Sequence, residues 1–190
     1  MRKFIILFSF AFIIGSVYFI FFRPKHKFGE VVDRFHGVEV YYNGRIGNTD
    51  GRNVAKDGYN LGMKYQCVEF VKRFYYEYLK HKMPETYGNA KDFFDRNVSD
   101  GNINRSRDLL QFCNGSKEKP EENDLLIFDG HAGNEYGHVA IISKVNDTEI
   151  EIVQQNPGVN GNSRKNIGLT FTNGKWVLSE TRILGWLRKK

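Results

Sequence analysis

Hydrophobic side chains recur at two different spacings along the chain, and the first of these is helical. Within 65–80 the apolar residues fall three or four positions apart, which gathers them on one face of an α-helix. These residues are Cys67, Phe70, Val71, Phe74 and Tyr78. Two further helices are predicted over 90–96 and, from a weaker pattern, over 107–112. Cys67 is therefore expected at the start of an amphipathic helix.

The second spacing is that of β-strands, and it dominates the later part of the chain. Short apolar or alternating segments are separated by turn residues such as Asn146-Asp147 and Asn173-Gly174. The predicted strands are 38–42, 124–128, 138–145, 149–156, 170–172, 176–178 and 182–187. Between the first strand and the helix, 43–62 is rich in Gly, Asn and Asp and is predicted to be a long loop. A helix followed by an antiparallel sheet is an α+β fold.

An almost unbroken apolar stretch covers 4–22, close to the length of about 20 residues that an α-helix needs to cross a membrane. A cleaved signal peptide is the alternative, but 21–24 reads Phe-Phe-Arg-Pro and offers no small-residue cleavage site. We therefore expect a transmembrane anchor at 1–22, a basic linker at 23–36 and one domain at 37–190. A short N-terminal tail before one span favours a single-pass membrane protein whose domain lies outside the cytoplasm.

Composition narrows the function classes. The 190 residues carry a net charge of +6, but no long run of Lys and Arg and no recognition motif accompanies it, so no nucleic-acid partner is expected. The two cysteines, Cys67 and Cys113, are too few for a disulfide framework, although one bridge between them remains an alternative. No carboxylate or cysteine stands at ligand spacing to His131 and His138, so no metal site is predicted.

Cys67 and His138 are the candidate chemical pair. A cysteine attacks an acyl carbon as its thiolate, which a helix N-terminus and a neighbouring imidazole both stabilise. Cys67 begins the predicted helix, and His138 begins a predicted strand just after Gly137. The chain order of a cysteine on a helix, then a histidine and an amide on strands, is that of papain-like enzymes. A buried structural cysteine is the alternative for Cys67.

The second nitrogen of the imidazole needs a partner that orients the ring. Gln154 and Asn156 share one face of the strand 149–156, whereas Gln155 points to the other. A simple two-residue turn before this strand would place Gln155 opposite His138. We therefore predict a longer loop or a β-bulge that brings Gln154 or Asn156 onto the face of His138.

Three segments resemble the CHAP superfamily of cysteine, histidine-dependent amidohydrolases and peptidases. They read Gly-Met-Lys-Tyr-Gln-Cys-Val-Glu-Phe at 62–70, Gly-His-Val-Ala-Ile-Ile at 137–142 and Ile-Val-Gln-Gln-Asn at 152–156. Within the superfamily they are most similar to the amidase domain of bifunctional glutathionylspermidine synthetase/amidase, and 124–129 and 183–186 share that likeness. The resemblance implies a papain-like α+β fold over 37–190 and cleavage of amide bonds without a cofactor.

The resemblance also implies roles for individual residues. Cys67 would be the nucleophile, His138 the base, and Gln66 a contributor to the oxyanion hole beside the Cys67 backbone N–H. Asn156 matches an amide of the family near the histidine. Gln154 stands where that amidase has Glu, so it can orient the imidazole but not neutralise an imidazolium. Lys72 stands at the position of an Arg and would contact a substrate carboxylate.

Three functions follow from these expectations. The first is a membrane-anchored cysteine amidohydrolase or peptidase that cleaves cell-wall peptides, which the outward-facing anchor favours. The second is an amidase of the glutathionylspermidine type. The third is a weakened CHAP module that binds but does not hydrolyse, which only the neutral Gln154 supports.

Overall fold

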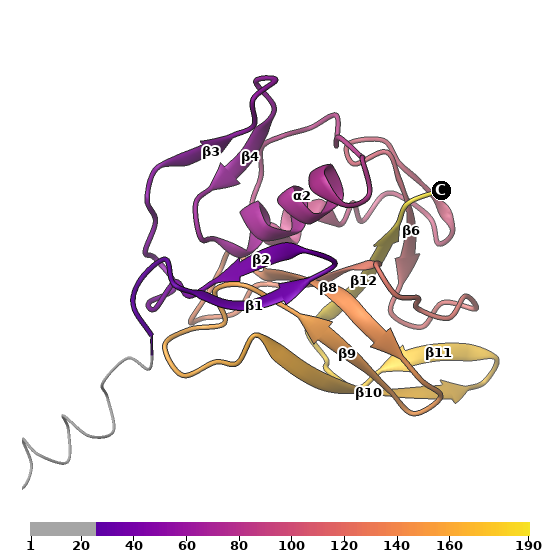
Figure 1. Cartoon of the computed structure of the whole chain (residues 1–190). Helices are drawn as coiled ribbons and strands as arrows, with labels where there is room; N and C mark the ends of the chain where they lie inside the picture. The colour runs from indigo at the N-terminus through magenta and orange to yellow at the C-terminus, as the bar shows by residue number, and fades with distance from the viewer. Residues whose placement is uncertain (1–25) are drawn as a thin grey trace, which may run out of the picture.

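The computed structural model describes residues 26–190, and antiparallel strands make up most of its regular structure (Figure 1). The strands are β1 (Val31–Phe35), β2 (Val38–Tyr41), β3 (Arg52–Val54), β4 (Asn60–Met63), β5 (Asn102–Asn104), β6 (Leu109–Cys113), β7 (Leu125–Phe128), β8 (His138–Val145), β9 (Glu149–Val153), β10 (Arg164–Thr172), β11 (Lys175–Leu178) and β12 (Ile183–Arg188). The helical elements in this part are the α-helix α2 (Cys67–Glu77) and the 3-10 helix η1 (Ala90–Phe93).

One sheet of eight strands forms the centre of the domain. Its order is β11-β10-β9-β8-β7-β12-β6-β5, and all neighbouring pairs are antiparallel. Two small sheets, β1-β2 and β3-β4, lie beside α2 (Figure 1). The central strands β7 and β8 are therefore paired on both edges, which makes them a rigid support for residues at their ends.

The central sheet is buried on both faces, and β8 shows why its sequence is a continuous apolar run. Val139 and Ile141 pack with Phe70 of α2 in one core cluster. Ala140 and Ile142 alternate with them and belong to a second cluster on the other face. Because successive side chains of a strand point to opposite faces, burial on both sides requires apolar residues throughout.

Strands pack against helix α2 on its polar side as well as on its apolar face. The helix contacts β8 on the sheet side and also contacts β2 and β4. Glu69, Lys72 and Arg73 are therefore buried. The helical periodicity alone would place Lys72 and Arg73 on the outer face, because neither falls on the apolar stripe. Gly62 of β4 lies against the helix backbone: a Cβ there would be 3.3 Å from Cα of Glu69. The close approach of this strand explains how polar helix residues become enclosed.

Most predicted elements are confirmed, including the helix around Cys67 and the hairpin at Asn173-Gly174. The predicted helix over 107–112 is wrong: this segment contributes β6, whose backbone pairs with β12 and β5. The predicted helix over 90–96 is only the 3-10 turn η1, and the predicted loop over 43–62 contains β3 and β4. Part of the predicted linker forms β1, which pairs with β2.

The fold class predicted from the sequence also needs correction. The prediction was an α+β papain-like domain, with the helix of Cys67 packed on an antiparallel sheet, preceded by one transmembrane helix. The part of the chain described by the structure is mostly antiparallel sheet with a single α-helix of 11 residues. None of the helices within 26–190 is long and apolar enough to cross a bilayer. The apolar stretch 4–22 lies outside the described residues. The structure thus gives no support for a preceding transmembrane helix or for a single-pass membrane protein, and both expectations are withdrawn.

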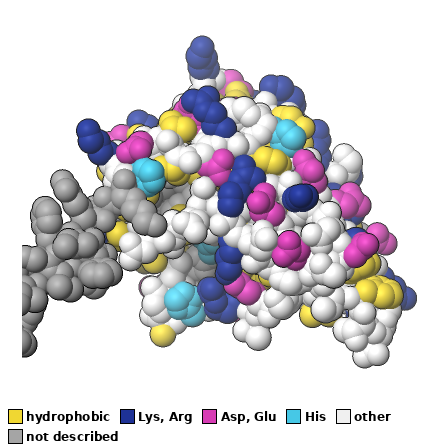
Figure 2. Space-filling view, turned by 60° about the horizontal axis from the view of Figure 1, so that its bottom comes forward, with side chains coloured by type: hydrophobic (Ala, Val, Ile, Leu, Met, Phe, Trp, Pro, Cys, Tyr) yellow, Lys and Arg dark blue, Asp and Glu magenta, His cyan; other side chains and the backbone are white. Residues whose placement is uncertain are grey.

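The net positive charge is spread rather than concentrated on the face seen in Figure 2. Lys and Arg side chains are interspersed there with Asp and Glu (Figure 2). Ion pairs of the described residues include Lys119 with Asp147 at 2.7 Å and Arg96 with Asp129 at 2.7 Å. Local pairing, rather than the total of +6, therefore decides the field near any one groove.

Candidate active site

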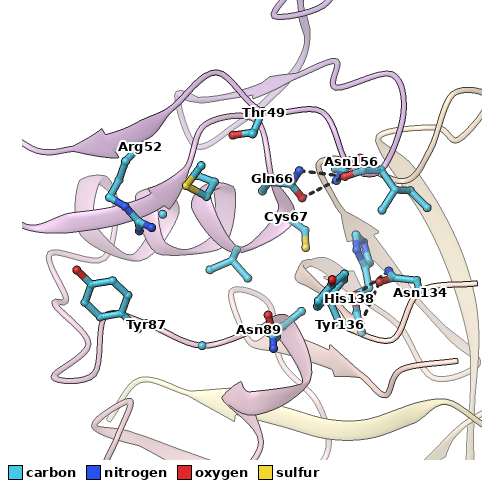
Figure 3. A pocket seen from close by; sticks show the side chains of 18 of the residues that line it. Thr49, Arg52, Gln66, Cys67, Tyr87, Asn89, Asn134, Tyr136, His138 and Asn156 are labelled. Atoms are coloured by element: carbon cyan, nitrogen blue, oxygen red, sulfur yellow. Dashed lines mark hydrogen bonds between the residues drawn. The ribbon is translucent and has the colours of Figure 1, made fainter.

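Cys67 is the first residue of α2, and its buried side chain lines a pocket of about 420 Å³ (Figure 3). The first amide groups of a helix have no intrahelical acceptor, so they favour negative charge placed against them. Burial nevertheless raises the pKa of the Cys67 thiol above its ordinary value, and the backbone N–H groups of Val139 and Val68 offset only part of that rise. The resting side chain is therefore a thiol.

His138 lines the same pocket (Figure 3), and Gln154 holds its ring. Its Nε2 lies 2.9 Å from Oε1 of Gln154. The amide nitrogen of Gln154 donates to the backbone carbonyl of Asn162 at 3.0 Å, which turns the amide oxygen toward the ring. Because that oxygen only accepts, Nε2 of His138 is the donor and Nδ1 keeps the lone pair. The ring is thus set with Nδ1 as the basic nitrogen.

Gly137 allows β8 to begin at this place. Its φ is +77°, and a Cβ there would lie 2.5 Å from the carbonyl oxygen of Phe128 on the neighbouring strand β7. Only glycine avoids both the backbone strain and this contact. The residue before His138 therefore fixes how closely the imidazole approaches β7.

The electrostatics of the pair favour neutral groups. The pKa of His138 is lowered to about 4, mainly by burial; the hydrogen bond with Gln154 acts in the opposite direction, and the charges of Arg182 and Lys165 add to the lowering. With the pKa of Cys67 raised and that of His138 lowered, the resting state at neutral pH is a thiol beside a neutral imidazole. The pair therefore does not rest as a thiolate–imidazolium ion pair.

A β-bulge between β8 and β9 selects which amide faces His138. The pairing register shifts between Ile142 and Lys144, which confirms the predicted break in the simple register. Gln154 consequently lies on the face of His138, and Gln155 points to the opposite side. An unbulged ladder would exchange these two side chains, since a shift of one residue moves a side chain to the other face.

Gln155 ties β9 to the start of α2, a role that sequence reasoning missed. Its Nε2 donates to the backbone carbonyl of Gln66 at 3.0 Å and to Oε2 of Glu69 at 2.9 Å. Glu69 also pairs with Arg73 at 2.7 Å, so the buried carboxylate has a cationic partner. The spacing of Glu69 two residues after Cys67 and the double Gln in the chain were the available signals.

Gln66 and Asn156 form the upper edge of the pocket (Figure 3). Asn156 Nδ2 donates to Oε1 of Gln66 at 2.8 Å. Gln66 Nε2 donates to the backbone carbonyls of Ile46 and Asn48, at 3.0 and 2.6 Å. Both N–H bonds of the Gln66 amide are thus occupied in this conformation. Its predicted role in an oxyanion hole stays a prediction.

A family model described as the CHAP domain matches residues 57–156, more than half of the chain. The chain belongs to the CHAP domain family. This match includes Cys67, His138 and Gln154, the residues brought together around the pocket.

Curated relatives of this CHAP domain include a trypanothione synthetase and two bifunctional glutathionylspermidine synthetase/amidases. Trypanothione synthetase of Crithidia fasciculata is 32% identical over 130 residues, which are 68% of this chain and 20% of that protein. Bifunctional glutathionylspermidine synthetase/amidase of Escherichia coli (strain K12) and of Shigella flexneri are each 34% identical over 151 residues. These matches cover 72% of this chain and 23% of each relative, so the chain spans less than a quarter of these proteins. Family and relatives together support an amidohydrolase or peptidase.

Lys72 does not line the pocket of the CHAP domain. Its side chain is 0% exposed, and Nζ donates to the backbone carbonyls of Asn60 and Thr86. Burial lowers the pKa of Lys72 to about 8, and the charges of Arg107 and Arg52 act in the same direction. The structure therefore places Lys72 behind the pocket wall, as an anchor for two backbone segments.

Arg52 is the cation that does line the pocket. It lies at the end opposite Cys67, next to Tyr87, with its guanidinium carbon 5.4 Å from the ring centroid (Figure 3). One guanidinium nitrogen donates to Oδ1 of Asn60 at 3.1 Å. Sequence reasoning missed Arg52 because the residue reaches the pocket through the pairing of β3 with β4, in which Arg52 lies opposite Met63.

Proposed function

We propose that this CHAP domain is a thiol-dependent amidase or peptidase in which Cys67 is the nucleophile and His138 the general base. The observation that carries the proposal is the single pocket lined by both residues, in which Gln154 leaves Nδ1 of His138 as the proton acceptor. The thiol supplies the nucleophile and the imidazole moves the proton, so the reaction requires no cofactor.

In the proposed reaction, Sγ of Cys67 attacks the amide carbon while Nδ1 of His138 takes the thiol proton. Backbone N–H groups at the start of α2 stabilise the negative oxygen that develops. The C–N bond then breaks, and the imidazolium gives its proton to the leaving amine. Water attacks the resulting thioester with His138 as base, which releases the acid and restores the thiol.

Gln66 and Asn156 have linked roles in this proposal. Gln66 reaches a developing oxyanion only when one of its N–H bonds leaves the carbonyl of Ile46 or Asn48. Asn156 holds the other end of the same amide and thereby positions it. Arg52, at the far end of the pocket, suits an anionic group on the acyl part of the substrate.

Two substrate classes remain candidates at this point. Cell-wall peptides were favoured because of the expected outward-facing anchor, which the structure does not support. The printed name of the synthetase/amidase relatives points instead to glutathionylspermidine. Both substrates contain an amide that the proposed pair would cleave by the same steps.

A test of the proposed function compares the full chain with two cysteine variants. Purified peptidoglycan and glutathionylspermidine are incubated with wild type, Cys67→Ala and Cys113→Ala, and mass spectrometry identifies the products. Cys113 is the matched control because it is also a free cysteine and does not line the pocket. We expect products from wild type and Cys113→Ala but none from Cys67→Ala. Hydrolysis that survives in Cys67→Ala would refute the proposal, and failure of wild type on both substrates would favour a binding module.

A further inference from the structure

A second groove, of about 410 Å³, continues from the pocket beyond His138. It is lined by His138 and Gln154 but not by Cys67. The two cavities share the residues Ile46, Asn134, His138 and Asn156. The imidazole therefore stands at the junction of a pocket that contains the sulfur and a groove that does not.

The chemistry assigns one part of an amide substrate to each cavity. The acyl carbon bonds to Sγ of Cys67, so the acyl part occupies the pocket that the sulfur lines. The amine nitrogen receives its proton from His138, so the amine part leaves past the imidazole. The groove lined by His138 without Cys67 is the space available to that amine part.

Positive side chains outnumber negative ones along the groove. Arg164, Lys165 and Arg182 line it, with Glu180 as the single carboxylate. Arg164 is paired with Asp33 at 2.7 Å. Lys165 is paired with Oε1 of Glu180, whose Oε2 is buried with no hydrogen-bond partner among the described residues. The carboxylate of the groove thus already has a cationic partner.

Arg182 is the cation of this groove that has no carboxylate partner within residues 26–190. Its side chain is exposed, with the guanidinium carbon 6.0 Å from the ring centroid of Phe128. Arg182 and His138 line the same groove. A guanidinium offers a planar pair of donors that matches a carboxylate.

We propose that the amine part of the substrate carries a carboxylate that Arg182 binds in this groove, and that amines with several positive charges are disfavoured. The inference rests on the proposed function and selects between its substrate classes. A peptide bond to an amino acid with a free or side-chain carboxylate fits the groove. The polyamine part of glutathionylspermidine would instead place an ammonium group against Arg182, because Arg164 and Lys165 already have carboxylate partners.

Three amides that differ only in the charge of a four-carbon amine part test this inference. The amine parts are 4-aminobutyrate, butylamine and 1,4-diaminobutane, each joined to a glutathionyl and to an alanyl-glutamyl acyl part. Calorimetry measures their binding to full-length Cys67→Ala, and hydrolysis by wild type is measured separately. We expect the carboxylate-bearing amide to bind about tenfold more tightly than the diaminobutane amide, with a smaller ratio at high salt.

Charge reversal identifies the residue responsible. Arg182→Glu in the Cys67→Ala background is expected to abolish or reverse the preference, whereas Arg105→Glu, which changes an exposed arginine outside both cavities, leaves it unchanged. The inference would be overturned if the diaminobutane amide bound as tightly as the carboxylate-bearing amide or more tightly. It would also be overturned if no amide bound, or if Arg182→Glu and Arg105→Glu changed the preference equally. A carboxylate preference in binding without hydrolysis by wild type would support the groove assignment and refute only the proposed enzymatic activity.

Discussion

Oε1 of Gln154 lies 2.9 Å from Nε2 of His138, and this contact leaves Nδ1 of the imidazole as the unprotonated nitrogen without giving the ring a negative partner. A carboxylate at the same place would stabilise an imidazolium more strongly than this neutral amide, whose hydrogen bond offsets only part of the effect of burial. The pKa of His138 consequently stays low at about 4, and the site rests as two neutral groups.

Replacing Gln154 by Glu is therefore expected to change the resting state of the site. The new carboxylate raises the pKa of His138 by favouring the imidazolium, which in turn favours the thiolate of Cys67. We expect the His138 titration, followed by NMR, to move upward by at least about one pH unit. Alkylation of Cys67 by iodoacetamide at pH 7 should become faster by about tenfold.

Asn160→Asp is the control for this change, because it adds the same charge to an exposed position of the groove. It should shift the titration of His138 much less than Gln154→Glu does. Equal shifts in the two variants would mean that general charge, and not the contact with Nε2, sets the pKa of His138.

The pH dependence of wild-type activity follows from the same contact. His138 acts as a base only when unprotonated, so kcat/KM should be lost as the pH falls through about 4. Between pH 5 and pH 7 the rate limited by this group should stay nearly constant, because His138 is already neutral there. A pH–rate profile of the full chain, corrected for unfolding, measures this. Loss of activity around pH 6 to 7 would contradict the neutral pair.

Gln155→Leu should weaken the connection between β9 and the start of α2. The substitution leaves Oε2 of Glu69 and the carbonyl of Gln66 without this donor, which costs about 1–3 kcal/mol of unfolding free energy. Urea denaturation measures the loss, and kcat should fall with it because Cys67 follows Gln66. Asn166→Ala, which removes an exposed amide of β10, should change stability by less than about 0.5 kcal/mol. Similar losses in both variants would show that Gln155 has no special role.

Gly137 and Gly174 separate backbone strain from a steric clash. Their φ angles are +77° and +73°, but a Cβ at Gly137 meets the carbonyl of Phe128 at 2.5 Å, whereas one at Gly174 meets nothing within 4 Å. Gly174→Ala should lower the unfolding free energy by about 1 kcal/mol, the cost of strain alone. Gly137→Ala should lower it further and reduce activity by displacing His138. Thermal unfolding and kcat/KM are measured for both variants. Equal losses in Gly137→Ala and Gly174→Ala would argue against the clash with the carbonyl of Phe128.

The sequence predicted the parts of the fold that depend on local pattern. Periodicity located the helix of Cys67, and the predicted strand His138–Val145 matches β8. Asn173-Gly174 marks the turn between β10 and β11. The bulge was predictable because an unbroken register would have turned Gln155 toward His138. Each of these inferences used residues close together in the chain.

The remaining features depend on which distant segments meet. The segment 107–112 becomes a strand because β12 and β5 pair with it, and no local pattern reports those partners. Lys72 appears exposed by periodicity, yet the carbonyls of Asn60 and Thr86 enclose it. Arg52 and Arg182 reach the active-site cavities only through the packing of hairpins and loops around α2 and β8.

Trapping the acyl-enzyme tests the central claim most directly. The full chain is mixed with an amide substrate, quenched in acid within the first turnover, and digested for mass spectrometry. The account predicts an acyl group attached to Cys67 in wild type and in Cys113→Ala, and none in His138→Ala, which has no base to take the thiol proton in the first step. Hydrolysis without an acyl group on Cys67, or an acyl group found on Cys113 instead, would contradict it.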